Sequence, residues 1–103
     1  MAHYLQLVIL TDQGRKNFDE NPEWVKDVNR EIELMGAKII TQYALLGQYD
    51  FVNIIEAPSD EIAAKVAIKL SEGGAMQPMT LTAIPLDNLI ETLKKGRRSS
   101  PLQ

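Results

Sequence analysis

Four polar side chains stand inside strand-like apolar runs, where they could bind a small molecule. They are the amides of Gln6 and Asn53 and the hydroxyls of Thr80 and Thr82. Apolar side chains would pack more simply at such positions, and buried polar groups need hydrogen-bond partners. Those partners could be one another, water or a polar ligand, so these four residues form a candidate ligand-binding set. A simple polar network and a true pocket both remain open, and Gln42 or Tyr43 could join either.

The segment that includes Gly47, Tyr49 and Asp50 separates two apolar runs and predicts a hairpin turn. Gly47 can adopt a positive φ, Asp50 can bond nearby amides and Tyr49 can pack against a strand end, so turn formation explains all three. Loops at sheet ends also carry function, which keeps a ligand-binding role open. Asp12, after the first strand, has the same two interpretations. Taking the first and third strands as parallel, we expect Asp12 and Asp50 at opposite edges, which excludes a carboxylate dyad within one chain.

Metal and nucleophile chemistry find little support in the composition. His3 is the only histidine, and the chain has no cysteine. A lone imidazole near a terminus is a weak metal ligand or base, and without cysteine there is neither a thiolate nor a disulfide. Neither main helix contains a histidine that could ligate haem. We therefore expect no metal site and no cofactor.

The length and charge of the chain further limit the classes of protein to which it could belong. The chain of 103 residues suits one domain. Its 11 basic and 14 acidic residues create no field that would attract a phosphate backbone or an anionic lipid, so we expect no nucleic acid and no membrane partner. Apolar runs are short and broken by charges, and the amino terminus lacks a signal-peptide pattern. These features predict a cytoplasmic protein.

The elements that would position these residues follow from apolar spacing and capping residues. Alternation predicts strands over residues 3–10, 37–46, 51–56 and 76–85, with a tight turn at 11–14 after the first. Helical spacing predicts helices over 21–36 and 58–73 and a shorter terminal helix over 86–95. Residues 1–95 would form the domain. Residues 96–103 are small, basic and polar, which predicts a disordered tail.

This element order predicts an α+β fold of the ferredoxin-like βαββαβ type with a C-terminal helix. The antiparallel sheet would have strand order 4-1-3-2, with both main helices on one face. We assign the candidate ligand set to the other face, together with apolar residues of the first and third strands, namely Tyr4, Val8, Leu10, Phe51 and Ile55. Such a face needs a cover, and a second subunit would provide it. We therefore expect a homo-oligomer, either a dimer of the α/β-barrel type or an assembly of dimers.

On these motifs the chain resembles the GYD-domain family, named for a glycine, a tyrosine and an aspartate that stand here as Gly47, Tyr49 and Asp50. Residues 11–14, 56–61 and 80–83 also agree with the family pattern, over roughly residues 3–95. Residues 76–79 depart from it, because a segment of the valine-arginine-threonine type is expected there, so the resemblance implies no anion-binding arginine at this place. The resemblance implies a small ferredoxin-like protein and carries no settled biochemical function.

Two function classes are favoured, and a purely structural or interaction role also stays open. The first is an oligomeric small-molecule-binding or regulatory domain. The second is a cofactor-free enzyme resembling antibiotic-biosynthesis monooxygenases, which fold analogy alone suggests. The excess of acidic over basic residues argues against RNA recognition on the sheet.

Overall fold

The computed structural model describes residues 1–99, and their side chains as far as residue 95. Four strands and four helices follow one another along the chain: β1 (Ala2–Leu10), α1 (Asp12–Glu20), α2 (Trp24–Leu34), β2 (Lys38–Ala44), β3 (Phe51–Ala57), α3 (Asp60–Glu72), β4 (Met76–Ala83) and α4 (Leu86–Ser99). This order confirms the α+β, ferredoxin-like prediction, with α1 as an additional helix.

The sheet has the order β2-β3-β1-β4, which is the predicted order, and β1 pairs antiparallel with both neighbours. The expectation that the first and third strands are parallel is therefore wrong. The helical crossover makes β2 run in the same direction as β1, and the following hairpin then reverses β3. As a result Val8, near the end of β1, pairs with Phe51 at the start of β3. Asp12 and Asp50 thus lie at the same end of the sheet.

Helix α1 occupies the place of the predicted turn after β1. Thr11 is its N-cap, because the Thr11 hydroxyl accepts a hydrogen bond of 3.1 Å from the Gly14 amide. The same hydroxyl donates to the Gly74 carbonyl at 2.6 Å, and the Thr11 amide donates to the Ala75 carbonyl at 3.0 Å. The segment that looked like a reversal therefore caps a helix and ties it to the start of β4.

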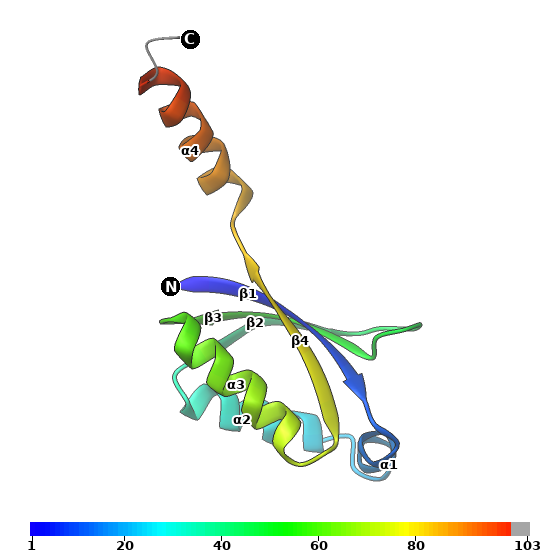
Figure 1. Cartoon of the computed structure of the whole chain (residues 1–103). Helices are drawn as coiled ribbons and strands as arrows, with labels where there is room; N and C mark the ends of the chain where they lie inside the picture. Colours follow the sequence, from blue (N-terminus) through cyan, green and yellow to red (C-terminus); the bar gives the residue numbers. More distant parts are fainter. Residues whose placement is uncertain (100–103) are drawn as a thin grey trace.

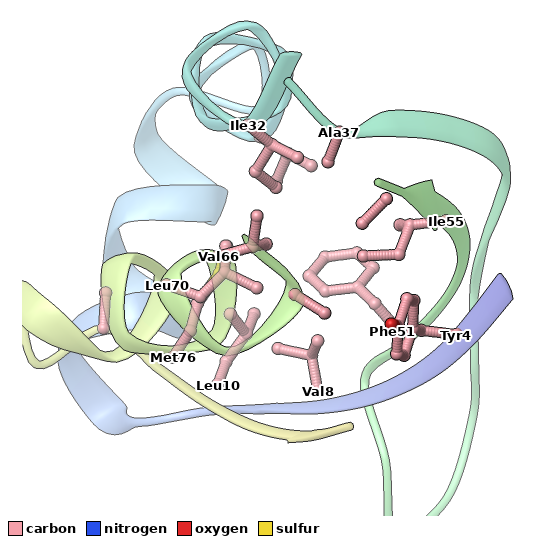
Figure 2. Packing of buried hydrophobic residues seen from close by; sticks show 14 residues of the cluster. Tyr4, Val8, Leu10, Ile32, Ala37, Phe51, Ile55, Val66, Leu70 and Met76 are labelled. Carbon is pink, nitrogen blue, oxygen red and sulfur yellow. The ribbon is translucent and has the colours of Figure 1, made fainter. Parts of the chain in front are cut away.

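Helices α2 and α3 lie on the same face of the sheet (Figure 1). Figure 2 shows the core between them and the sheet, where strand and helix side chains point toward one another. The buried cluster combines strand residues with helix residues and includes Tyr4, Val8, Leu10, Ile32, Phe51, Ile55, Val66, Leu70 and Met76. The prediction that these β1 and β3 residues face away from the helices is therefore wrong. Both faces of these strands are apolar, so alternation alone could not identify the side that the helices cover.

The opposite face of the sheet is also apolar, and no helix of the described chain covers it (Figure 1). Leu7 of β1 pairs across the strands with Val52 and with Met79, and Leu5 pairs with Ile54 and with Leu81. Met79 and Leu81 are about half exposed, at 49% and 47%. We call this surface the open face, defined by Leu5, Leu7, Val52, Ile54, Met79 and Leu81.

The two edges of the sheet are both irregular. Pro78 lies inside β4, which is an edge strand, where the missing amide hydrogen of proline is tolerated. On the other edge, the pairing of β2 with β3 shifts register between Ile39 and Thr41. Each edge therefore presents an interrupted row of backbone groups.

Helix α4 projects away from the rest of the protein (Figure 1). Its large apolar side chains are exposed, with Leu86 at 68%, Leu89 at 41%, Ile90 at 38% and Leu93 at 60%. The helix continues to Ser99, so residues 96–99 of the predicted tail are helical, while residues 100–103 lie outside the described residues. Within the described residues, the structure contains no helix with the length and apolar character needed to span a membrane.

Replacing Gly14 with alanine should destabilise the fold. The added Cβ would lie 2.1 Å from the Ala75 carbonyl oxygen, so the backbone of α1 or β4 would have to move. We expect Gly14→Ala to lower the free energy of unfolding by about 1–3 kcal/mol in urea titrations. Gly73→Ala is the matched control, because nothing lies within 4 Å of its added Cβ. Equal losses in the two variants would contradict the close-approach argument.

Candidate functional site

A chain of hydrogen-bonded side chains crosses the helix-covered face of the sheet from α2 to β4. Asn29 of α2 exchanges two bonds with Gln42 of β2, at 2.8 and 3.2 Å. Gln42 donates to Asn53 of β3 at 2.9 Å, and Asn53 donates to Gln6 of β1 at 3.3 Å. Gln6 in turn donates to the Thr80 hydroxyl of β4 at 3.4 Å. One polar network thus links a helix to all four strands.

This network contains three of the four residues of the predicted ligand set. Gln6 and Asn53 are 0% and 4% exposed, Thr80 is half-buried, and Thr82 is exposed and lies at the rim of the same face. Among the described residues, every buried side-chain nitrogen and oxygen has a hydrogen-bond partner. In the structure Gln6, Asn53 and Thr80 are linked by hydrogen bonds beneath the helices, away from the open face on which they were predicted to lie.

The network also shows which side chains of β2 face the helices. Gln42 pairs with Asn53 and joins the network, whereas Tyr43 lies on the opposite side of the sheet and is 63% exposed. Asn29 was not among the site residues predicted from the sequence. A signal for it existed, because Asn29 follows the buried Val25 by four residues and precedes the buried Ile32 by three, which places all three on one face of α2.

Breaking the network in the middle should cost stability. Asn53→Leu keeps similar volume but removes the donor to Gln6 Oε1, which is fully buried and would lose its partner. We expect a loss of about 1–3 kcal/mol in the free energy of unfolding, measured by urea denaturation. Thr82→Val is the control, because Thr82 is exposed, and it should change stability by less than about 0.5 kcal/mol. A loss for Thr82→Val as large as that for Asn53→Leu would refute the assignment.

A second polar contact under the helices joins β1 to the first turn of α3. The buried Tyr4 phenol donates a hydrogen bond to Asp60 Oδ1. This hydrogen bond is the main reason that the pKa of Tyr4 rises from 10.0 to about 12, with burial and the negative charges of Asp60 and Glu61 adding to it. The neighbouring Ser59 caps the helix as predicted, with its hydroxyl accepting from the Ile62 amide at 3.2 Å. The start of α3 is thus fixed on β1.

The raised Tyr4 pKa predicts a particular loss of stability in alkaline solution. The native state holds the phenolic proton more tightly than the unfolded chain, so this contribution is complete below pH 10 and is lost as the pH rises through about 12. We expect the stability of Tyr4→Phe to fall less than that of the wild type over this interval, in urea midpoints measured at a series of pH values. Parallel pH profiles for the two proteins would show that the contact does not couple to folding.

The hairpin between β2 and β3 is bound to the end of β1 through Asp50. The Asp50 carboxylate oxygen Oδ2 accepts from the Leu10 amide at 2.7 Å, and the Asp50 amide donates to the Val8 carbonyl at 2.8 Å. Within the hairpin the Leu45 amide donates to the Asp50 carbonyl at 2.8 Å. Gly47 has a φ of +123°, which confirms the positive φ predicted for this turn. Asp50 therefore fastens the turn to the neighbouring strand, and Tyr49 beside it is half-buried.

A pocket of about 380 Å³ lies where α1, the hairpin and the end of β1 meet. Its lining combines apolar side chains with three charged ones, namely Leu10, Phe18, Pro22, Ala44, Leu45, Phe51, Arg15, Asp19 and Asp50. The Phe18 and Phe51 rings pack edge to face, with their centroids 5.3 Å apart. Because it is partly apolar, carries a few charges and includes an aspartate of the hairpin motif, this pocket is the candidate functional site.

Arg15 connects the two aspartates that the sequence analysis placed at opposite edges. One guanidinium nitrogen lies 3.2 Å from Asp12 Oδ1, and the other lies 4.0 Å from Asp50 Oδ2. Asp12 is fully exposed outside the pocket, whereas Asp50 lines it. The two carboxylates therefore share one cation, a relation that the parallel-strand expectation excluded. Among the described residues, no group of three or more histidine, cysteine, aspartate or glutamate side chains could hold a metal ion.

Comparison with known proteins identifies a family and a sequence relative. The family model described as the GYD domain matches residues 4–93. A protein of Thermus thermophilus, named glutamine synthetase and cystathionine beta-lyase binding protein, is 42% identical over 95 residues, which cover 91% of this chain and all of that protein.

A solved structure is similar to this chain in fold. The crystal structure of MtbAldR shares 15% identity and a TM-score of 0.61, and the match covers 82% of this chain and 52% of that one, so the chain spans about half its length. A dimeric ferredoxin-like protein from an uncultured marine organism gives a TM-score of 0.37 at 10% identity, over 82% of this chain and 93% of that one.

Proposed function

Since this chain belongs to the GYD-domain family, we propose that it is a regulatory binding domain that assembles with a second copy of itself and attaches to metabolic enzymes. The observation that carries the proposal is the 42% identity to the Thermus thermophilus binding protein over the whole of that protein. We infer that glutamine synthetase and cystathionine beta-lyase, the two enzymes in the name of that relative, are the partners to test first.

The open face supports self-assembly. Its six defining residues are all apolar and lie in cross-strand pairs that run over three neighbouring strands. A broad apolar surface of this kind is expected to be covered by another protein surface. A second copy presents the same surface, and a two-fold axis through it would bring the two sheets together. This arrangement is the α/β-barrel dimer expected from the sequence, with Leu5 and Leu7 at the shared surface in place of Tyr4 and Val8.

Helix α4 provides a separate surface for an enzyme. Its exposed Leu86, Leu89, Ile90 and Leu93 recur at helical spacing. An amphipathic helix that lays such a stripe into a groove is a recurring mode of recognition between proteins. Figure 1 shows α4 projecting beyond the sheet on the side opposite α2 and α3, and its large apolar side chains are exposed in the single chain. We therefore assign self-assembly to the open face and enzyme binding to α4.

The hypotheses based on a polar cavity between two sheets lose their supporting residues. Both the small-molecule cavity and the monooxygenase-like enzyme required the amides of Gln6 and Asn53 on the surface shared by the subunits. These amides lie under the helices instead, and the open face presents apolar side chains. Protein binding is thus the function that the geometry supports best.

A charge in the centre of the open face should separate the subunits. Leu7 lies between Val52 and Met79, so Leu7→Lys would put an ammonium group where two sheets meet. We expect a dimer for the wild type and a folded monomer for the variant, by light scattering at micromolar concentration with circular dichroism as the check on folding. Leu34→Lys, at an 88% exposed position on α2, is the control and should remain dimeric. A monomeric wild type would defeat this assignment.

Enzyme binding can be measured directly with the full chain. We expect biolayer interferometry to detect binding to glutamine synthetase or cystathionine beta-lyase from the same organism, and Leu89→Glu combined with Leu93→Glu to weaken it at least about tenfold. Leu34→Glu should bind as the wild type does. If the wild type binds neither enzyme, the proposed function is wrong. If the double variant instead becomes monomeric, α4 belongs to the subunit interface and its assignment to enzyme binding is wrong.

A further inference from the structure

We propose that the pocket between α1 and the Gly47–Asp50 hairpin binds a small organic cation, in which a primary ammonium group is attached to an apolar body. The proposal goes beyond enzyme binding and concerns a different part of the molecule. The pocket lies at the end of the sheet where β1 ends at Leu10 and β4 begins at Met76, whereas α4 follows the opposite end of β4. Its ligand would therefore contact neither α4 nor the six residues of the open face.

The size and lining of the pocket fit a small amphipathic molecule. A volume of about 380 Å³ lies in the lower part of the range found for small-molecule sites. Six of the nine lining residues are apolar, and the paired Phe18 and Phe51 rings supply aromatic surface. The body of the ligand would displace water from these side chains, which favours binding in proportion to the apolar area that is covered.

The charges of the pocket select the sign of the polar group. Arg15, Asp19 and Asp50 give the lining one positive and two negative side chains. The Arg15 guanidinium already faces the carboxylates of Asp12 and Asp50, at 3.2 and 4.0 Å. The Asp19 side chain has neither an ion-pair nor a hydrogen-bond partner among residues 1–95. The unbalanced charge is therefore a carboxylate, which an ammonium group would neutralise.

Asp50 offers a second acceptor to the same ammonium group. Its Oδ2 accepts from the Leu10 amide, and its Oδ1 receives no hydrogen bond from the side chains and backbone that the structure describes. The side chain is held in place by the strand it contacts and is 28% exposed, so it is both ordered and accessible. Asp50 thus acts as a fixed acceptor on the hairpin side, and Asp19 as an exposed acceptor on α1.

Three probes with the same ring and different charges test the proposal by isothermal titration with the full-length wild type. Phenethylamine carries only the ammonium group, L-phenylalanine carries both charges, and phenylacetate carries only the carboxylate. We expect phenethylamine to bind with a dissociation constant below about 10 mM and phenylacetate not to bind. L-Phenylalanine should bind more weakly than phenethylamine, because Arg15 already faces two carboxylates and the ligand carboxylate would lie beside Asp19 and Asp50. Binding as tight as that of phenethylamine would identify an amino acid as the source of the ammonium group. Equal binding of all three probes, or binding of phenylacetate alone, would overturn the proposal.

Variants place the bound cation in this pocket. Asp19→Asn should weaken phenethylamine about threefold or more, while Glu20→Gln, which neutralises the next carboxylate along α1, should leave it unchanged. Leu45→Lys would put a positive charge in the apolar wall and should weaken phenethylamine binding, because the two ammonium groups repel each other. Asp19 is exposed and Leu45 lies at the surface, so all three variants should melt as the wild type does. Equal phenethylamine affinities for Asp19→Asn and Glu20→Gln would show that this pocket is not the site.

Discussion

The buried amides of Gln6 and Asn53 constrain the whole arrangement of helices and strands. An amide that is shielded from water must find partners, and here the partners come from α2 and from every other strand. A shift of one strand by two residues would keep apolar side chains in the core but would separate Asn53 from Gln6. A rotation of α2 would move Asn29 away from Gln42. The apolar residues supply most of the stabilisation, and the amides determine which packing is adopted.

Much of the fold could be predicted from local patterns in the sequence, and the errors came from places where local patterns are symmetric. Strand order followed from element order and the handedness of crossovers. The facing of β1 did not, because Leu5 and Leu7 on one side are as apolar as Val8 and Leu10 on the other. The choice depends on which side α2 and α3 cover, and that is a tertiary property. Helix α1 was missed because its nine residues are mostly polar, with Phe18 as its single large apolar side chain.

In the candidate site, too, local patterns predicted some features and tertiary packing decided the others. The sequence identified the residues of the hairpin and those of the polar network apart from Asn29, yet it could not assign their roles. Asp50 was expected to bond amides within its own turn, whereas its carboxylate bonds the amide of Leu10 on another strand. The pocket beside it depends on α1, which the sequence interpretation had reduced to a turn. Residues from the end of β1, from α1 and from the hairpin line the pocket, and their spacing along the chain does not predict that they lie together.

The irregular edges of the sheet have a consequence for how copies of this protein can associate. A regular edge strand invites a further strand to add to it, and repeated addition leads to open-ended aggregates. Pro78 removes a donor from one edge, and the shifted pairing between Ile39 and Thr41 disturbs the other. Growth by strand addition is therefore hindered at both sides, while the apolar surface of Leu5, Leu7 and their neighbours stays free to stack. When two such surfaces stack, both are fully used and no further copy can add. The protein can therefore associate through one face of its sheet without polymerising.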